Sequence, residues 1–156
     1  MNTQPRNVRD TWLHFLSDNL PGVVVWNVRR DTNVVMGTVS ASQAQLKINA
    51  VNVCFAVDNF RTHVSSVVAS IDIAYDDELK AVEVVSKLYT ILQAAAYTPL
   101  LDYSSDTPVS TGGMLIWNPN AVNFKPVADE LAYRRTCNLT LQYKTEPVPG
   151  LSQPAS

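Results

Sequence analysis

The sequence predicts one α+β domain, with a mostly antiparallel sheet and helices packed on one face. Three observations support this fold class: a helix–strands–long helix–strands order, a long amphipathic segment after residue 77, and strict alternation over residues 133–144. A chain of 156 residues with 46% apolar residues can bury a sizeable core. We assign residues 1–146 to this domain and the Pro-rich residues 147–156 to a flexible C-terminal tail.

The first predicted helix covers residues 7–22, where Pro21-Gly22 ends it. Its apolar positions fall at helical spacing and are Val8, Trp12, Phe15, Leu16 and Leu20. The β-branched and aromatic run VVVWNV follows and predicts a strand. Residues 34–42 predict a weaker strand that Gly37 bends.

Two β-segments occupy the middle of the chain. In residues 44–60 the alternation of apolar residues changes phase near Ala50, which predicts a bulge or a tight turn there. Residues 65–75 keep a single phase and predict a strand with one buried face. The apolar positions of that face are Val67, Ala69, Ile71, Ile73 and Tyr75.

The longest predicted helix begins at Asp76-Asp77-Glu78, because carboxylates stabilise a helix N-terminus, and it stops before Thr98-Pro99. Its expected apolar stripe is Leu79, Val82, Val85, Leu88, Leu92 and Ala95. Residues 98–113 are rich in Pro, Ser, Thr and Gly and predict a loop. A short strand at residues 114–118 and an irregular segment at 119–131 follow.

The final predicted strand, residues 133–144, places large or apolar residues on one face and polar residues on the other. Arg135 is the exception, since it puts a guanidinium on the buried side. The two helices and the clean strand faces together predict a shared core. We expect it to contain Trp12, Phe15, Leu16, Ile71, Ile73, Leu79, Val82, Leu88, Leu92, Leu139 and Leu141.

Composition bounds the function. Charged residues make up 17% of the chain, against about 25% in a typical protein, which leaves more neutral surface for contacts. The net charge of -2 provides no basic field for nucleic acid, so we expect no sequence-specific nucleic-acid binding. The N-terminus lacks a signal-peptide pattern and no apolar run suits a membrane span, so we expect a soluble protein with no membrane partner. For Cys54 and Cys137, two buried free thiols are favoured over one long-range disulfide.

Motifs for catalysis are missing from the sequence. There is no Gly-rich phosphate loop, no G-x-S-x-G and no H-E-x-x-H, and the two histidines, His14 and His63, do not sit in a catalytic pattern. We therefore expect no enzymatic activity and no cofactor. An enzyme site assembled from His63, the acidic cluster and Cys54 is the least favoured alternative.

The nearest approach to a metal site is an acidic cluster, but helix capping and the helix dipole explain three of its four residues. Its spacing matches no calcium loop, so we predict that it holds no metal. The cluster is Asp72, Asp76, Asp77 and Glu78.

The aromatic and basic residues leave several interpretations open. For Trp12, Trp26 and Trp117, core packing is favoured over a ligand platform, with an exposed Trp at a subunit contact as the second choice. The pairs Arg29-Arg30 and Arg134-Arg135 suit phosphate binding, an ion pair within the chain, or an ion pair with another subunit.

The chain opens with a short helix and a valine-rich strand, continues with SSVVASIDIAYDDELKAVEVVSKLYTILQ in its middle, and has ADELAYRRTCNLTLQYKTE near its end. This order of elements resembles the tail terminator proteins of long-tailed bacteriophages. The resemblance covers most of residues 7–146 and concerns pattern and order. The extended β-region at residues 23–65 and the 98–113 segment depart from it.

The resemblance implies a virion structural protein of the neck or tail, assembled in the host cytoplasm. Its implied form is a hexameric ring that caps the tail tube, joins it to the head–tail connector or stopper protein, and lets DNA pass through its lumen. Such a ring needs a head-to-tail contact. We expect Arg134 or Arg135 of one subunit to meet an acidic residue of the next, and we count Arg29 and Arg30 as further interface candidates. The acidic candidates are Asp72, Asp76, Asp77, Asp129 and Glu130.

Two alternatives remain beside the tail terminator. One is a head-completion or stopper adaptor of the phage neck, which is also a small ring component. The other is a small ligand- or peptide-binding module, whose pocket the 98–113 segment and the aromatic residues would form.

Overall fold

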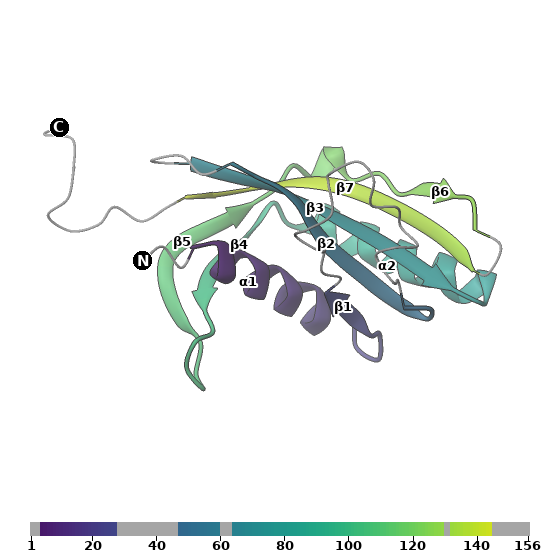
Figure 1. The fold of residues 1–156 in the computed structure, drawn as a ribbon, viewed down its shortest axis with the longest axis horizontal. Helices are drawn as coiled ribbons and strands as arrows, with labels where there is room; N and C mark the ends of the chain where they lie inside the picture. The colour runs from purple at the N-terminus through teal and green to yellow at the C-terminus, as the bar shows by residue number, and fades with distance from the viewer. Residues whose placement is uncertain (1–3, 28–46, 60–63, 130–131, 145–156) are drawn as a thin grey trace, which may run out of the picture.

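The computed structural model describes residues 4–27, 47–59, 64–129 and 132–144 (Figure 1). These residues form two α-helices and a curled, mostly antiparallel sheet. The expected mixture of helices with an antiparallel sheet is therefore confirmed. The strand expected at residues 34–42 and the tail at residues 147–156 lie outside the described residues.

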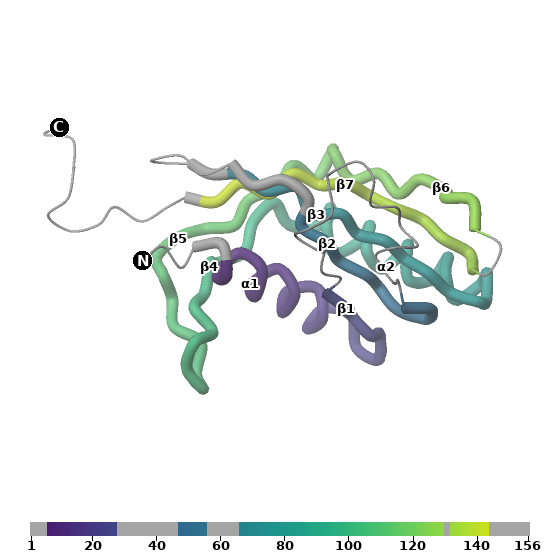
Figure 2. Tube along the Cα trace, viewed as in Figure 1, coloured from purple at the N-terminus to yellow at the C-terminus, as the bar shows by residue number. Residues whose placement is uncertain are grey.

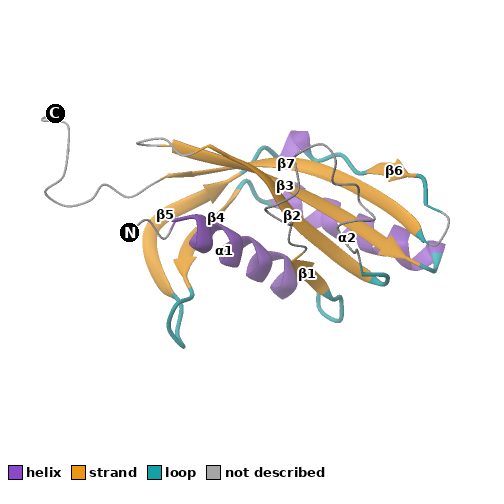
Figure 3. Cartoon of the chain, in the orientation of Figure 1, coloured by secondary structure: helices purple, strands orange, loops and turns teal. Residues whose placement is uncertain are grey.

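Figure 3 shows the helices and strands along the chain. The helices are α1 (Gln4–Asn19), α2 (Glu78–Ala94) and the short 3-10 helix η1 (Pro119–Ala121). The strands are β1 (Val25–Asn27), β2 (Ala50–Asn59), β3 (Val64–Tyr75), β4 (Tyr97–Asp102), β5 (Val109–Ile116), β6 (Lys125–Val127) and β7 (Tyr133–Lys144). Their order in the sheet is β1-β2-β3-β7-β5-β4, and β6 also pairs with β7.

Strand β7 organises the sheet. Along one edge it pairs antiparallel with β3 over the full length of both strands, from Val64 opposite Lys144 to Tyr75 opposite Tyr133. Its other edge is divided, because β6 pairs with its beginning and β5 with its end. The tube in Figure 2 shows β5 and β6 at opposite ends of β7. The β4–β5 hairpin thus extends the sheet only from one end of β7.

The change of phase predicted near Ala50 is a tight turn. Asn49 has φ 63°, in the left-handed region that Asn tolerates better than most residues. Its backbone N–H donates to the Ala74 carbonyl at 2.7 Å, which brings the start of β2 against the end of β3. A second irregularity, a register shift between Phe55 and Val57, lies further along β2.

The core forms around the inward phase of β3 and β7. The expected strand residues Ile71, Ile73, Leu139 and Leu141 are fully buried. Aromatic rings join α1 to the residue that follows β5, because the ring centres of Trp12 and Trp117 lie 5.3 Å apart. The Trp117 indole N–H in turn donates to the Leu92 carbonyl of α2 at 2.9 Å. The described core residues of both helices therefore belong to one cluster.

Most of the predicted core is confirmed, but two of its members are wrong. Trp12, Leu16, Leu88 and Leu92 are buried, and Phe15 is partly buried against the core. Leu79 and Val82 are instead 67% and 48% exposed.

The error lies in the phase of the α2 stripe. A step of three residues falls about 60° short of a full turn, so the repeated steps from Leu79 to Leu88 rotate to the opposite side of the helix. The residues that α2 buries are Ala81, Val84, Leu88 and Leu92.

The loop expected at residues 98–113 is also wrong, because these residues form most of the β4–β5 hairpin. Leu100 is buried, and the Thr111 hydroxyl donates to the Leu100 carbonyl at 2.7 Å. Pro99 is accommodated because β4 is an edge strand, where a missing N–H costs little. The prediction relied on composition, which gave no sign of β4 because Leu100 is the only buried residue of this short strand.

We predict that Leu88→Ala lowers the free energy of unfolding by about 2–5 kcal/mol, because it leaves a cavity in the core. Val82→Ala, on the exposed side of the same helix, should change it by less than about 0.5 kcal/mol. Urea denaturation followed by circular dichroism measures both. Equal losses for the two variants would contradict the observed phase of α2.

Candidate interaction surface

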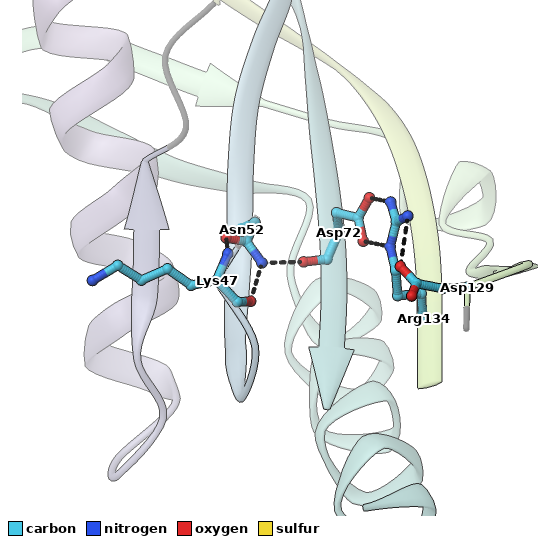
Figure 4. Close-up of polar contacts among 5 residues, drawn as sticks. All are labelled: Lys47, Asn52, Asp72, Asp129 and Arg134. Atoms are coloured by element: carbon cyan, nitrogen blue, oxygen red, sulfur yellow. Dashed lines mark hydrogen bonds and ion pairs between the residues drawn. The ribbon is translucent and has the colours of Figure 1, made fainter. Parts of the chain in front are cut away.

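A row of polar side chains crosses the sheet on the face opposite the inward residues of β3 and β7. Asn52 of β2 lies directly opposite Asp72 of β3, and Arg134 of β7 is two residues from the position opposite Asp72. Figure 4 shows that these side chains, with Lys47 and Asp129, form a chain of contacts across the strands. Asn52 is only 1% exposed, which is unusual for an amide side chain.

Arg134 is held by two carboxylates of its own chain. Its Nε donates to Asp72 Oδ1 at 3.1 Å, its Nη2 donates to Asp72 Oδ2, and its Nη1 donates to Asp129 Oδ2 at 3.3 Å. The side chain is only 7% exposed. The hydrogen bond with Asp72 raises the pKa of Arg134, while burial raises the pKa of Asp72 against the opposing effect of the guanidinium. The bidentate geometry ties β3 to β7 and to the segment before β7.

The arrangement of Arg134 matches the within-chain alternative for the arginine pairs. Arg135 lies opposite Ile73 and is half-buried. Arg29, Arg30 and Glu130 lie outside the described residues. A contact of Arg134 or Arg135 with another subunit remains a prediction.

The acidic cluster is divided among separate structural positions. Asp77 caps α2 by accepting the Leu79 N–H at 3.0 Å, as predicted. Asp76 accepts from the Asn49 amide at 3.4 Å and donates its backbone N–H to Asn49 Oδ1 at 3.2 Å. Asp72 belongs to the ion pair and Glu78 is exposed. Within the described residues, no group of three or more His, Cys, Asp or Glu is placed to hold a metal ion.

The buried amide of Asn52 fixes the turn that precedes β2. It accepts the Lys47 N–H and donates to the Lys47 carbonyl, both at 3.0 Å, and it also donates to the Asp72 carbonyl at 3.3 Å. Lys47 Nζ then lies 3.8 Å from the centre of the Trp26 ring. This cation–π pair occupies the β1 edge of the sheet, where Trp26 is 39% exposed.

Exposed apolar side chains gather at one end of the sheet. This end is where β1, β2, β7 and α2 begin and β3 ends. Of the eight large hydrophobic residues exposed in the described part of the chain, six belong to it. We call them the sheet-end surface: Val24, Trp26, Ile48, Leu79, Val82 and Tyr133. An apolar gathering of this kind is typical of a contact surface.

The remaining candidates occupy structural positions. His14 is exposed and stacks on Tyr103, with ring centres 4.0 Å apart. Trp12 and Trp117 are in the core, as favoured, but the core position is wrong for Trp26, which is 39% exposed on the short strand β1. His63 lies outside the described residues, so the arrangement proposed with Cys54 is not tested.

Sequence reasoning missed Val24 and Ile48 of the sheet-end surface, and it also missed Lys47 and Asn52 of the polar row. The sequence offered one signal for Asn52, because this amide stands between two valines of a predicted strand. The structure buries it there. Nothing in the sequence places Lys47 over Trp26, because that contact depends on the pairing of β1 with β2.

Neither the protein-family models nor the curated proteins contain a match to this chain. Among the described helices, none has the length and apolar content to cross a membrane.

We predict that Arg134→Met lowers the free energy of unfolding by about 3–5 kcal/mol at neutral pH, because it leaves the buried Asp72 carboxylate unpaired. Without the guanidinium, the two remaining influences on Asp72, burial and the charge of Asp129, both raise its pKa. An acid with a raised pKa in the folded state favours folding at low pH and loses that contribution as pH rises through the raised pKa.

The penalty of Arg134→Met should therefore shrink as pH falls from neutral towards the ordinary aspartate range. Urea denaturation at several pH values measures it, and Arg135→Met is the matched control with a smaller expected loss. A penalty for Arg134→Met that stays constant or grows on acidification would contradict this account.

We predict that Cys137 resists thiol reagents in the native protein while Cys54 reacts faster. Cys137 is buried and burial raises its pKa, whereas Cys54 is half-buried, and both are free. Mass spectrometry after a short iodoacetamide pulse separates the two peptides, and the urea-unfolded chain provides the control in which both react. Faster labelling of Cys137 than of Cys54 in the native protein would disprove the prediction.

Proposed function

We propose that this protein is a structural ring subunit of a phage neck or tail, of the tail terminator type, whose oligomer caps the tail tube beneath the head connector. In this proposal both helices pack on one face of the sheet. The protein acts by contact with copies of itself, with the tail tube protein and with the connector or stopper protein. No catalytic group or cofactor takes part.

The observation that carries the proposal is the sheet-end surface. Exposing Leu79 and Val82 on the first turns of α2 costs solvation free energy of about 25 cal/mol per Å² of apolar area, which a subunit contact would recover. A ring subunit needs contact surfaces of this kind in every copy. The element order of the resemblance adds support, since the described residues contain the N-terminal helix, the β3–α2 unit and the long final strand.

The ligand-binding alternative required a loop at residues 98–113 to form its pocket. These residues lie mainly in the β4–β5 hairpin instead, so this alternative is less favoured. A head-completion or stopper protein would use the same kind of contact surface. The position of the protein in the particle separates that role from tail termination.

The first test is immunogold electron microscopy of particles from the phage that encodes this chain. We expect the label at the junction of tail and head, and we expect particles from a gene knockout to carry tails that remain unjoined to heads. Label at another position, or no label on particles that contain all other neck components, would contradict the proposal.

A further inference from the structure

We propose that the β1 edge of one copy, carrying the Lys47–Trp26 pair, docks on the acidic first turns of α2 in a second copy. This inference rests on the proposed ring function and names the contact through which the ring would form. It moves the contact away from Arg134, whose guanidinium is already engaged by Asp72 and Asp129.

The first half of the contact is a cation held over the partly exposed aromatic ring of β1, the first strand in the order of the described strands. Lys47 Nζ lies 3.8 Å from the centre of the Trp26 ring. Three hydrogen bonds of the buried Asn52 amide fix the backbone of Lys47 and the adjoining strand, so little backbone freedom remains to be lost on binding. Val24 and Ile48 add exposed apolar area beside the pair. Trp in particular is enriched among residues that dominate interface energies.

The second half is an apolar patch with an acidic rim. Leu79 and Val82 are exposed on α2, and Asp76, Glu78 and Glu83 are exposed around them. Lys80 is the one cation within this segment, so the carboxylates prevail. A partner for this patch should present apolar area together with positive charge.

The β1 edge of the same protein meets both requirements. Lys47 supplies the positive charge, and Trp26, Val24 and Ile48 supply the apolar area. Within one copy the two halves do not meet through Lys47, since Figure 4 shows its side chain directed away from Asp72, toward β1. A second copy is therefore the occupant that the charges favour.

The two halves are different surfaces, so the contact is heterologous. Head-to-tail repetition of such a contact closes into a ring when the rotation between copies permits. A chain with one blocked half should still bind through its other half. This property gives the inference a direct test.

The test uses two half-blocked variants of the full chain. Lys47→Glu with Trp26→Ala blocks the β1 edge, and Leu79→Ser with Val82→Ser blocks the α2 turns without adding a cation that could pair with the reversed charge at position 47. Lys87→Glu is the matched control, because Lys87 is exposed on α2 two turns beyond Leu79. Circular dichroism checks folding. If the edge-blocked variant unfolds, Lys47→Met replaces it, since this removes the charge and keeps an unbranched side chain.

Sedimentation velocity then measures association of each chain and of the mixture. We expect wild type and Lys87→Glu to form oligomers, and each blocked variant alone to associate at least about tenfold more weakly, a change of about 1.4 kcal/mol. An equal mixture of the two blocked variants should form a complex of one copy of each, which cannot grow further.

Three results would overturn the inference: a wild-type chain that stays monomeric at all concentrations, blocked variants that assemble as wild type does, or a mixture that forms no complex. The failure of the proposed function is seen separately, as absence of immunogold label from the head–tail junction. Labelled particles together with unaffected assembly of the blocked variants would reject the contact and retain the function.

Discussion

The antiparallel pairing of β3 with β7 is the constraint on which the rest of the structure depends. Every residue of β3 from Val64 to Tyr75 has a partner in β7, so the inward or outward direction of each side chain is fixed along both strands at once. The phase that contains Ile71 and Leu139 enters the core. A slip of one residue would exchange this phase for the polar one, and the pairing is therefore specified by the whole apolar face.

The same pairing forces charged residues onto the opposite face, where the chain satisfies them itself. Asp72 alternates with the buried Ile71 and Ile73, and Arg134 reaches it from β7 with two donors. The two charges lie largely out of water, so each depends on the other, and the pair favours one register of the two strands. Asn52 extends the polar row to β2 and fixes the turn at Lys47. Sheet registry and the exposed β1 edge are thus connected through one buried amide.

Local rules made much of this fold predictable, and their failures have physical causes. The final strand, β3 and the Asp77 cap follow from alternation and helix-end electrostatics, which act over a few residues. The exposure of Leu79 depends on how α2 is rotated against the sheet, and the small Ala81 gave no strong signal for the true phase. The Lys47–Trp26 pair and the Asp72–Arg134 pair join residues distant in sequence, so only the strand order brings them together.

The position of a charge, more than its identity, decides whether it serves the fold or a partner. Arg134 was a natural candidate for a subunit contact, yet its burial between two carboxylates means that freeing it would leave Asp72 unpaired inside the sheet. Lys47 has the opposite character, because only its backbone is engaged by Asn52 while its ammonium group lies over an exposed ring. A contact made through Lys47 would leave the fold's own ion pair undisturbed. For this reason the proposed contact between the β1 edge and the first turns of α2 would disturb the fold less than a contact made through Arg134.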